Sequence, residues 1–585
     1  MNVNTLVPSP VLLCAAAGAL ALTLVAGPVA AEGMAVGKPQ FSKAVAFDVS
    51  RPARDIAPMS AAARFALPES GLLDVRPDRG PLMKDKGYSG DGALGRSMAA
   101  TPPKKIAGFA NFEGLSNTDN FNLFGFRVNP PDPVGDVGPR HYVEMVNLAV
   151  AVYDKQGNVL MGPIAIGDLW AGFPVEDCTD PSGDPIVVYD QLVNRWILSQ
   201  FTTRGLDDPT LPFYNCVAVS KTPDPTGEYY RYAFITQPDS VDGGYFFPDY
   251  PKYGVWTDSY IMTTRDFGLV NRYGISVYAL EKAKMISGNP DVRAVQFFLD
   301  SDVVPLELIG DGLLPADIDG RRRPQNGIAA PIFGSQDDDA FYGATFDAMN
   351  VWELKVLWNS RAEASLTLAA QLPVAPFDSI FPCAPTSRDC LPQPGIVNPT
   401  QFLDILSYRQ RVTHRLAYRN FGSHEALVTN QSVEARPGIA GVRWYEVRRS
   451  GGVYTVFQQG TYAPDDGVHR WMGSAAMDRD GNMALGYSVV NGIDVFPGIR
   501  YATRSAGDPL GEMTAEGTII DGTGVQTTTN SRWGDYTSLN VDPTDDCTFW
   551  YVNEYYTAEG QASSLAGWQT RIASFKLDGC SPSAR

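Results

Sequence analysis

The sequence predicts an all-β fold, a single β-propeller of seven four-stranded blades. Three observations support this: short strand-like runs recur along the chain, turn residues separate them, and long amphipathic helical patterns are missing. The chain has 585 residues with 11% aromatic side chains, 56 Gly and 44 Pro. This composition suits a large core built from many short strands and tight turns. Only residues 279–286 have the pattern of a short helix.

The repeat is an aromatic or β-branched run that follows a turn, and we assign it as the second strand of each blade. Its seven copies are residues 142–148, 196–202, 260–265, 340–346, 424–431, 483–489 and 548–555. The turns before them, such as residues 478–482, carry the Asp, Asn and Gly that tight hairpins prefer. Because the copies are farther apart than in most propellers, we expect insertions between them. The fourth copy is the least regular, so six or eight blades remain alternatives.

The closure of the ring is predicted to use both ends of the propeller domain. The last unit ends with its third strand, at residues 570–577, shortly before the C-terminus. An unpaired outer strand would promote aggregation. We therefore expect residues 106–113 to supply the missing fourth strand, so that an N-terminal strand closes the propeller.

The chain divides into three predicted segments. Residues 1–31 resemble a signal peptide, because an apolar run ends in the small residues Val29, Ala30 and Ala31. No Lys or Arg precedes the run, so an uncleaved membrane anchor is the alternative. Residues 32–104 are predicted to be a disordered or weakly ordered extension. Residues 105–580 form the propeller, with insertions at 301–323 and 377–411 on its top face, which we define as the face where the innermost strands begin.

Export implies a secreted or extracytoplasmic location, either periplasmic or extracellular, in which cysteines become oxidised. Six cysteines follow the apolar run, and strand alternation assigns each to a face. Cys178 and Cys216 belong to the top face, and Cys547 and Cys580 to the bottom face. Cys383 and Cys390 share one top-face insertion. We expect these three disulfides, although other connectivities remain open.

Charge and motifs exclude several classes of function. The net charge of −18 disfavours nucleic acid and anionic membrane surfaces as partners, and we expect a monomer without membrane insertion after signal removal. The sequence contains no HExxH, GxSxG or P-loop motif. No cofactor is expected, and calcium is the one ion considered, at the acidic turns 337–339 and 545–546.

Candidate functional residues gather where the innermost strands begin, around the mouth of the central channel. As catalytic residues we consider Asp136, Asp184, Asp535 and Tyr536, and as substrate-binding residues Asp249, Tyr250, Arg415, Arg470, Trp471, Arg532 and Trp533. The arginines would bind a planar anion, an Asp would act as general acid or base, and the aromatic rings would stack on a sugar. The alternative is that these Arg and Asp side chains pair with one another and only stabilise the channel wall.

The chain resembles secreted bacterial propellers of the sialidase-like, BNR-repeat superfamily. The resemblance rests on residues 183–201, 470–488 and 531–555, and it covers about 105–580 as repeat architecture. It implies an arginine triad made by Arg415, Arg470 and Arg532, with Glu554 and Tyr555 as a nucleophile pair and Asp136 or Asp184 as the acid. The superfamily's SxDxGxTW box is absent as written, which counts against sialidase activity.

Two functions remain as hypotheses. The first is a carbohydrate-binding protein that takes an extracellular, anionic glycan at the channel mouth, and that as an enzyme would be a glycoside hydrolase or a polysaccharide lyase. The second is a non-catalytic adhesion or protein-interaction propeller at the cell surface, because the sequence holds no decisive catalytic motif.

Overall fold

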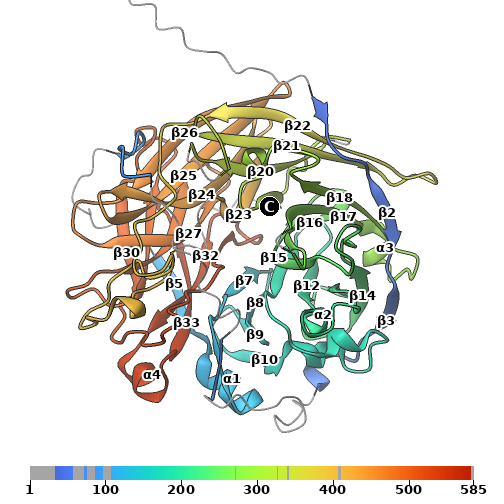
Figure 1. Cartoon of the computed structure of the whole chain (residues 1–585), viewed down its shortest axis with the longest axis horizontal. Coiled ribbons are helices and arrows are strands. Elements are labelled where there is room, and N and C mark those ends of the chain that lie inside the picture. The colour runs from blue at the N-terminus through green and yellow to red at the C-terminus, as the bar shows by residue number, and fades with distance from the viewer. Residues whose placement is uncertain are drawn as a thin grey trace, which may run out of the picture.

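The computed structural model describes residues 33–56, 71–74, 86–95, 107–270, 272–325, 327–338, 342–405 and 410–580. The expected signal peptide at 1–31 lies outside these residues. Within them, five antiparallel sheets and one nine-stranded sheet are arranged around a central axis (Figure 1), and the nine-stranded sheet joins two four-stranded sets through a parallel pairing of residues 316–319 with 416–419. The innermost strands contact one another in blade order, and the seventh returns to the first. The predicted all-β propeller is confirmed, and the sheets of the described residues divide into seven blades.

Each blade follows the chain outward from the channel. Blade one is β7 Val134–Val137, β8 His141–Val146, β9 Ala149–Asp154 and β10 Val159–Ala165. Blade two is β11 Ile186–Asp190, β12 Arg195–Phe201, β13 Tyr214–Ser220 and β14 Tyr229–Ile235. Blade three is β15 Phe247–Val255, β16 Ser259–Phe267, β17 Tyr273–Glu281 and β18 Arg293–Asp300. Blade four is β19 Leu313–Asp319, β20 Ala330–Gln336, β21 Ala348–Leu357 and β22 Glu363–Pro373.

The other three blades follow the same plan. Blade five is β23 Thr413–Asn420, β24 Glu425–Arg436, β25 Ile439–Ser450 and β26 Val453–Tyr462. Blade six is β27 His469–Met477, β28 Met483–Val490, β29 Gly498–Arg504 and β30 Ala515–Ile520. Blade seven is β31 Ser538–Val541, β32 Phe549–Tyr556, β33 Trp568–Lys576 and β5 Ala107–Ser116. The short helices α1 Asn117–Phe124, α2 Arg204–Asp207, α3 Lys282–Ile286 and α4 Ala558–Ser563 lie in connections.

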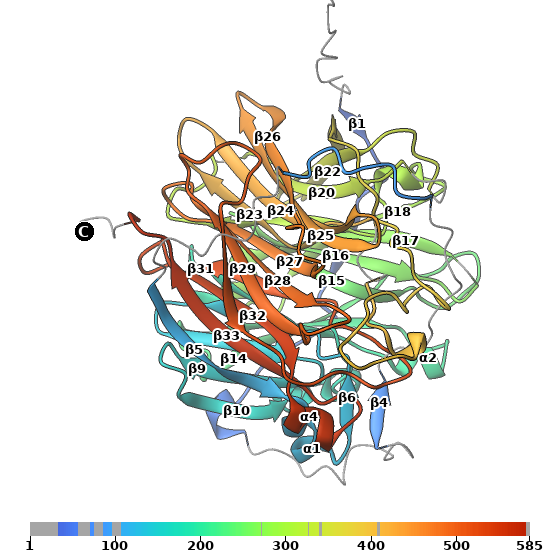
Figure 2. The same ribbon diagram turned by 90° about the vertical axis from the view of Figure 1, so that its left-hand side faces the viewer.

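Closure by an N-terminal strand is confirmed. Strand β5 runs antiparallel to β33, with Phe112 opposite Ile572 and Ala110 opposite Ser574. Figure 2 shows β31, β32, β33 and β5 side by side, so blade seven combines both ends of the propeller domain. This pairing satisfies the backbone of β33, which would otherwise be an exposed edge.

Blade four differs from the sequence prediction. Its second strand is β20, while residues 342–346 of the predicted copy lie in the loop between β20 and β21. Part of the predicted insertion at 301–323 is the innermost strand β19, whose seven residues are all buried. The error arose because a fully buried strand lacks the alternation that marks a half-buried one. The segment at 377–411 does form a long connection before β23.

The N-terminal extension is more ordered than predicted. Strands β1 Met34–Ala35, β2 Gln40–Lys43 and β3 Ala46–Val49 add a fifth strand to blades four, three and two. In Figure 1 they follow the outer rim as a blue ribbon. These strands carry no recognisable sequence pattern, because all four side chains of β2 are exposed and a strand added through its backbone needs no apolar alternation. Farther along, β4 Leu72–Asp74 pairs with β6 Arg127–Asn129.

All three predicted disulfides are present, joining Cys178 to Cys216, Cys383 to Cys390, and Cys547 to Cys580. The first links the connection into blade two with β13, which stabilises the top side of that blade. No helix of the described residues is long and apolar enough to cross a membrane.

Candidate functional site

The top-face site begins with a group of hydrogen bonds between blades two, three and seven. Asp184 precedes β11 and accepts hydrogen bonds from the Tyr250 backbone N–H (3.2 Å) and the Tyr536 hydroxyl (3.1 Å). Its own N–H donates to Asn147 (3.0 Å). The rings of Tyr250 and Tyr536 lie 5.2 Å apart. The structure therefore brings together three predicted site residues, Asp184, Tyr250 and Tyr536.

Lys252 lies between these two rings. Its Nζ is 3.1 Å from the centre of the Tyr250 ring and 3.4 Å from that of Tyr536. The residue is 1% exposed, and Nζ has no hydrogen-bond partner among the described residues. Burial lowers the pKa of Lys252 well below its usual value, and the nearby Arg411 lowers it further. The two ring faces stabilise a cation here but supply no acceptor for its protons.

Carboxyl groups surround the lysine. The Asp535 N–H donates to Asp132 (2.7 Å), and Arg532 forms an ion pair with Asp535 (3.0 Å). Burial raises the pKa of Asp535, but Arg532 and Arg411 outweigh it, so that this pKa falls below its usual range. Burial raises the pKa of Asp132 and that of Glu554 well above the usual range. The pKa of Asp535 is thus shifted in the opposite direction from those of Asp132 and Glu554.

Several buried polar atoms of the top-face site have no hydrogen-bond partner among the described residues. Within the described residues, hydrogen-bond partners are missing for Lys252 Nζ, Tyr250 Oη, Glu554 Oε2, His414 Nδ1, and Arg411 Nε and Nη1. The Arg411 guanidinium carbon also lies 4.0 Å from the centre of the Tyr250 ring. Buried polar groups are nearly always hydrogen-bonded, so these atoms are the ones that bound water or a ligand would satisfy.

The predicted arginine triad does not converge. Arg415 donates to Asp317 (2.9 Å) and to both oxygens of Asp319 (2.8 and 2.9 Å). Arg470 is 0% exposed and pairs with Asp466 (2.7 Å) and Glu516 (2.8 Å) within blade six. Of the three, Arg532 alone joins the top-face site. Arg415 and Arg470 are both held in ion pairs, but with carboxylates outside the predicted site, namely Asp317 and Asp319 for Arg415 and Asp466 and Glu516 for Arg470.

Three other predicted residues lie away from the top-face site. Trp471 and Trp533 are 0% exposed, and their rings pack 5.0 Å apart between blades six and seven. In this position they are core residues and cannot stack on a sugar. Asp249 is 8% exposed and lies opposite Arg265 in the register of β15 and β16.

Asp136 lies farther down the channel. It follows the start of β7 and accepts hydrogen bonds from the backbone N–H groups of Tyr189 and Val137, both at 2.7 Å. Burial raises the pKa of Asp136 to about 7, and the Asp317 carboxylate contributes to this. Asp136 thus belongs with the ion pairs of Arg415 and is separate from Asp184.

Sequence reasoning missed Lys252, Arg411 and Asp132. Asp132 and Arg411 lie just before innermost strands, where the search was made, but each lies four residues ahead of the position chosen, Asp136 or Arg415. Lys252 follows Tyr250 in the sequence Asp-Tyr-Pro-Lys. A lysine inside a predicted buried strand was the signal that could have found it, because unpaired lysines are rarely buried.

No protein-family model and no curated protein matches the chain. Among solved structures, the α-L-arabinanase of Penicillium chrysogenum shares 11% identity at a TM-score of 0.32, covering 67% of this chain and 94% of its own. The GH93 α-L-arabinofuranosidase of Fusarium graminearum shares 9% identity at a TM-score of 0.26, and the match covers 58% of this chain and 96% of its own. The α-L-arabinanase of Cellvibrio cellulosa shares 13% identity at a TM-score of 0.24, and the match covers 55% of this chain and 90% of its own. None of these three is a sialidase, and the propeller fold rests on the sheet topology described above.

Proposed function

We propose that the protein is an extracytoplasmic propeller that binds an acidic glycan at its top face, where Lys252 and Arg411 receive an anionic group. The observation that carries this proposal is the set of buried, unpartnered polar atoms around Lys252. A carboxylate or sulfate would supply acceptors for Lys252 and Arg411. The three disulfides agree with a location outside the cytoplasm.

Proton uptake should accompany binding. An anion beside Lys252 favours its charged form, so the lysine, whose pKa is lowered in the free protein, would take up a proton. Affinity should therefore fall as pH rises, and calorimetry in buffers of different ionisation enthalpy should show net proton uptake on binding. A binding site that lies elsewhere would show no such linkage.

Cleavage of the glycan is a second candidate, favoured by the opposite pKa shifts of two neighbouring carboxyl groups. Glu554, whose pKa is raised, would serve as general acid, and Asp535, whose pKa is lowered, as the ionised base or nucleophile. Asp184 and Tyr536 would not act on the substrate. They would instead position Lys252, which lies between the rings of Tyr250 and Tyr536. Glu554→Gln should then abolish reducing-end release while leaving binding intact.

The test is a glycan array with a parallel reducing-end release assay on the purified protein. Lys252→Met keeps the volume of the side chain and removes its charge, so it should abolish binding to acidic glycans. Lys43→Met is the matched control, because Lys43 forms an exposed ion pair with Asp291 on the outer rim. Glycan binding that survives Lys252→Met would refute the top-face site. If neither the wild type nor the variant binds any glycan, the proposal of a glycan ligand is refuted and a protein partner for adhesion is favoured.

A further inference from the structure

The bottom face carries a basic groove far from the top-face site. Two cavities of about 560 and 300 Å³ lie where the innermost strands end, and Arg322 and Asn420 line both. The larger runs between the turns of blades four and five, reaching Gly451 and Gly452. The smaller continues toward the turns of blades six and seven. The two cavities thus form one groove across four blades.

Three consecutive arginines form the floor of the groove. Arg321, Arg322 and Arg323 lie in the turn between β19 and β20, and all are exposed. Arg323 donates to the Leu192 carbonyl (3.1 Å), and its own carbonyl accepts from Asn420 (2.9 Å). Among the described residues, no ion pair or hydrogen bond involves the guanidinium groups of Arg321 or Arg322. The protein has a net charge of −18, so acidic side chains that could pair with these two guanidinium groups are abundant. Their lack of an ion pair therefore suggests a role in binding a ligand.

Backbone geometry holds Arg322 in the groove. Gly422, in the turn between β23 and β24, has a φ of +86°, and an added Cβ would overlap the Arg322 guanidinium. Gly320 has a φ of +78°, and an added Cβ there would meet the Arg419 guanidinium at 2.5 Å. Both turns therefore need glycine, for their backbone conformation and for the close approach of an arginine.

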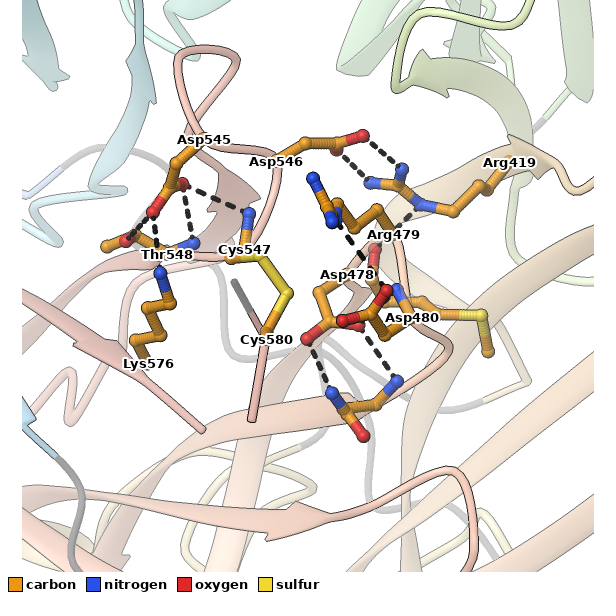
Figure 3. The surroundings of a disulfide bond; sticks show 12 residues. Arg419, Asp478, Arg479, Asp480, Asp545, Asp546, Cys547, Thr548, Lys576 and Cys580 are labelled. Carbon is orange, nitrogen blue, oxygen red and sulfur yellow. Dashed lines mark hydrogen bonds and ion pairs between the residues drawn. A yellow bond between two sulfur atoms is a disulfide. The ribbon is translucent and has the colours of Figure 1, made fainter. Parts of the chain in front are cut away.

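The carboxylates of the groove are already paired. Figure 3 shows Asp546 facing Arg419, at 2.8 Å, beside Arg479. Asp545 pairs with Lys576 (3.2 Å), as the same figure shows. Asp319, the third acidic residue of the smaller cavity, is held by Arg415 at 2.8 Å. Their charges are neutralised locally, so Arg321 and Arg322 dominate the potential that a ligand would meet.

We propose that this groove is a second binding site, for an oligosaccharide that carries at least two sulfate or carboxylate groups. Guanidinium groups match the planar, multidentate oxygens of such anions, and two adjoining cavities suit an extended ligand better than a single ion. Gly451 and Gly452, both exposed, also line the larger cavity. The site is independent of the top-face proposal, since the two share no residue.

Isothermal titration calorimetry with a heparin octasaccharide and with decagalacturonate tests the groove and distinguishes sulfate from carboxylate. We expect one probe to bind with an affinity that falls as NaCl is raised. Arg321→Ala with Arg322→Ala should weaken that binding about a hundredfold, or about tenfold for each charge-assisted contact. Arg322→Lys should lower the affinity about tenfold, because lysine keeps the positive charge but lacks the planar guanidinium that binds two oxygens at once.

The matched control is Arg51→Ala with Arg140→Ala, two exposed arginines outside the groove. All these variants should melt at the temperature of the wild type, because the altered side chains are exposed. Groove binding is refuted if neither probe binds, or if binding survives the Arg321 and Arg322 changes. A loss with Lys252→Met but not with the groove variant would assign the probe to the top face and overturn the groove proposal.

Discussion

Arg470 allows a direct test of whether a buried arginine stabilises the fold or binds the ligand. Its guanidinium is fully buried and donates to Glu516 (2.8 and 3.2 Å), Asp466 (2.7 and 3.0 Å) and the Val468 carbonyl (3.0 Å). In Arg470→Met, the buried Glu516 would keep only the Tyr487 hydroxyl (2.7 Å) and a distant Arg500 (3.6 Å). Breaking a buried pair in this way costs about 3–5 kcal/mol. We therefore expect a large loss of stability and unchanged glycan binding.

The assay is urea unfolding followed by tryptophan fluorescence, beside the binding assay. Glu516→Gln combined with Arg470→Met removes the stranded charge and should recover part of the lost free energy, since a neutral amide still accepts from Tyr487. A change below about 1 kcal/mol, the range of exposed pairs, together with lost ligand binding would refute the structural role. It would restore Arg470 as a ligand contact.

The remaining predictions concern disulfides, ring closure and pH. Cys178→Ser with Cys216→Ser removes a disulfide that joins residues 38 positions apart. By the chain-entropy relation, the free energy of unfolding should fall by about 4 kcal/mol. An unchanged midpoint of denaturant unfolding would contradict this. A chain starting at residue 105 keeps β5 and should fold, whereas one starting at 118 exposes β33 and should aggregate in size-exclusion chromatography; equal behaviour would refute closure by β5. Burial raises the pKa of Glu144 to about 7, so folding favours its protonated form. Its contribution to stability is complete below the unfolded pKa near 4.5 and is lost as pH rises through 7. Unfolding at pH 5 and pH 8 should differ by on the order of 3 kcal/mol from this group, and Glu144→Gln should reduce that difference; an unchanged pH profile would count against the shift.

Much of the fold was predictable because the propeller repeats a local signal. Six of the seven assigned second strands overlap the observed ones, and the turns before them carry Asp, Asn or Gly. Blade four failed because β19 is buried along its whole length and reads as an apolar connection. The rim strands β1, β2 and β3 could not be found, since they pair through their backbones with their side chains largely exposed or half-buried.

The site was harder to predict because side-chain direction depends on the partner strand. The search at the starts of innermost strands found Asp184, Tyr250, Arg532, Asp535 and Tyr536, which do lie together. The same rule chose Arg470 and Trp471, which turn into the blade instead of toward the channel. Position along a strand places a residue at one face, but only the carboxylates of neighbouring strands decide where a guanidinium points. Such partners come from distant parts of the chain, as Asp317 and Asp319 do for Arg415.

The two proposed sites are separated by the channel interior. Asp136, Tyr189, Asp317, Asp319 and Arg415 line a cavity of about 10 Å³, which is too small for more than one water molecule. Beside this cavity, Arg415 on β23 donates to Asp317 on β19, and the two strands are hydrogen-bonded to each other in parallel. A glycan cannot pass from the top face to the bottom groove by this route. The sites should therefore respond independently, and Lys252→Met combined with the Arg321 and Arg322 changes should show additive losses of binding free energy. Coupling between them would require movement of whole blades against one another, which the closed ring and its β5 strand oppose.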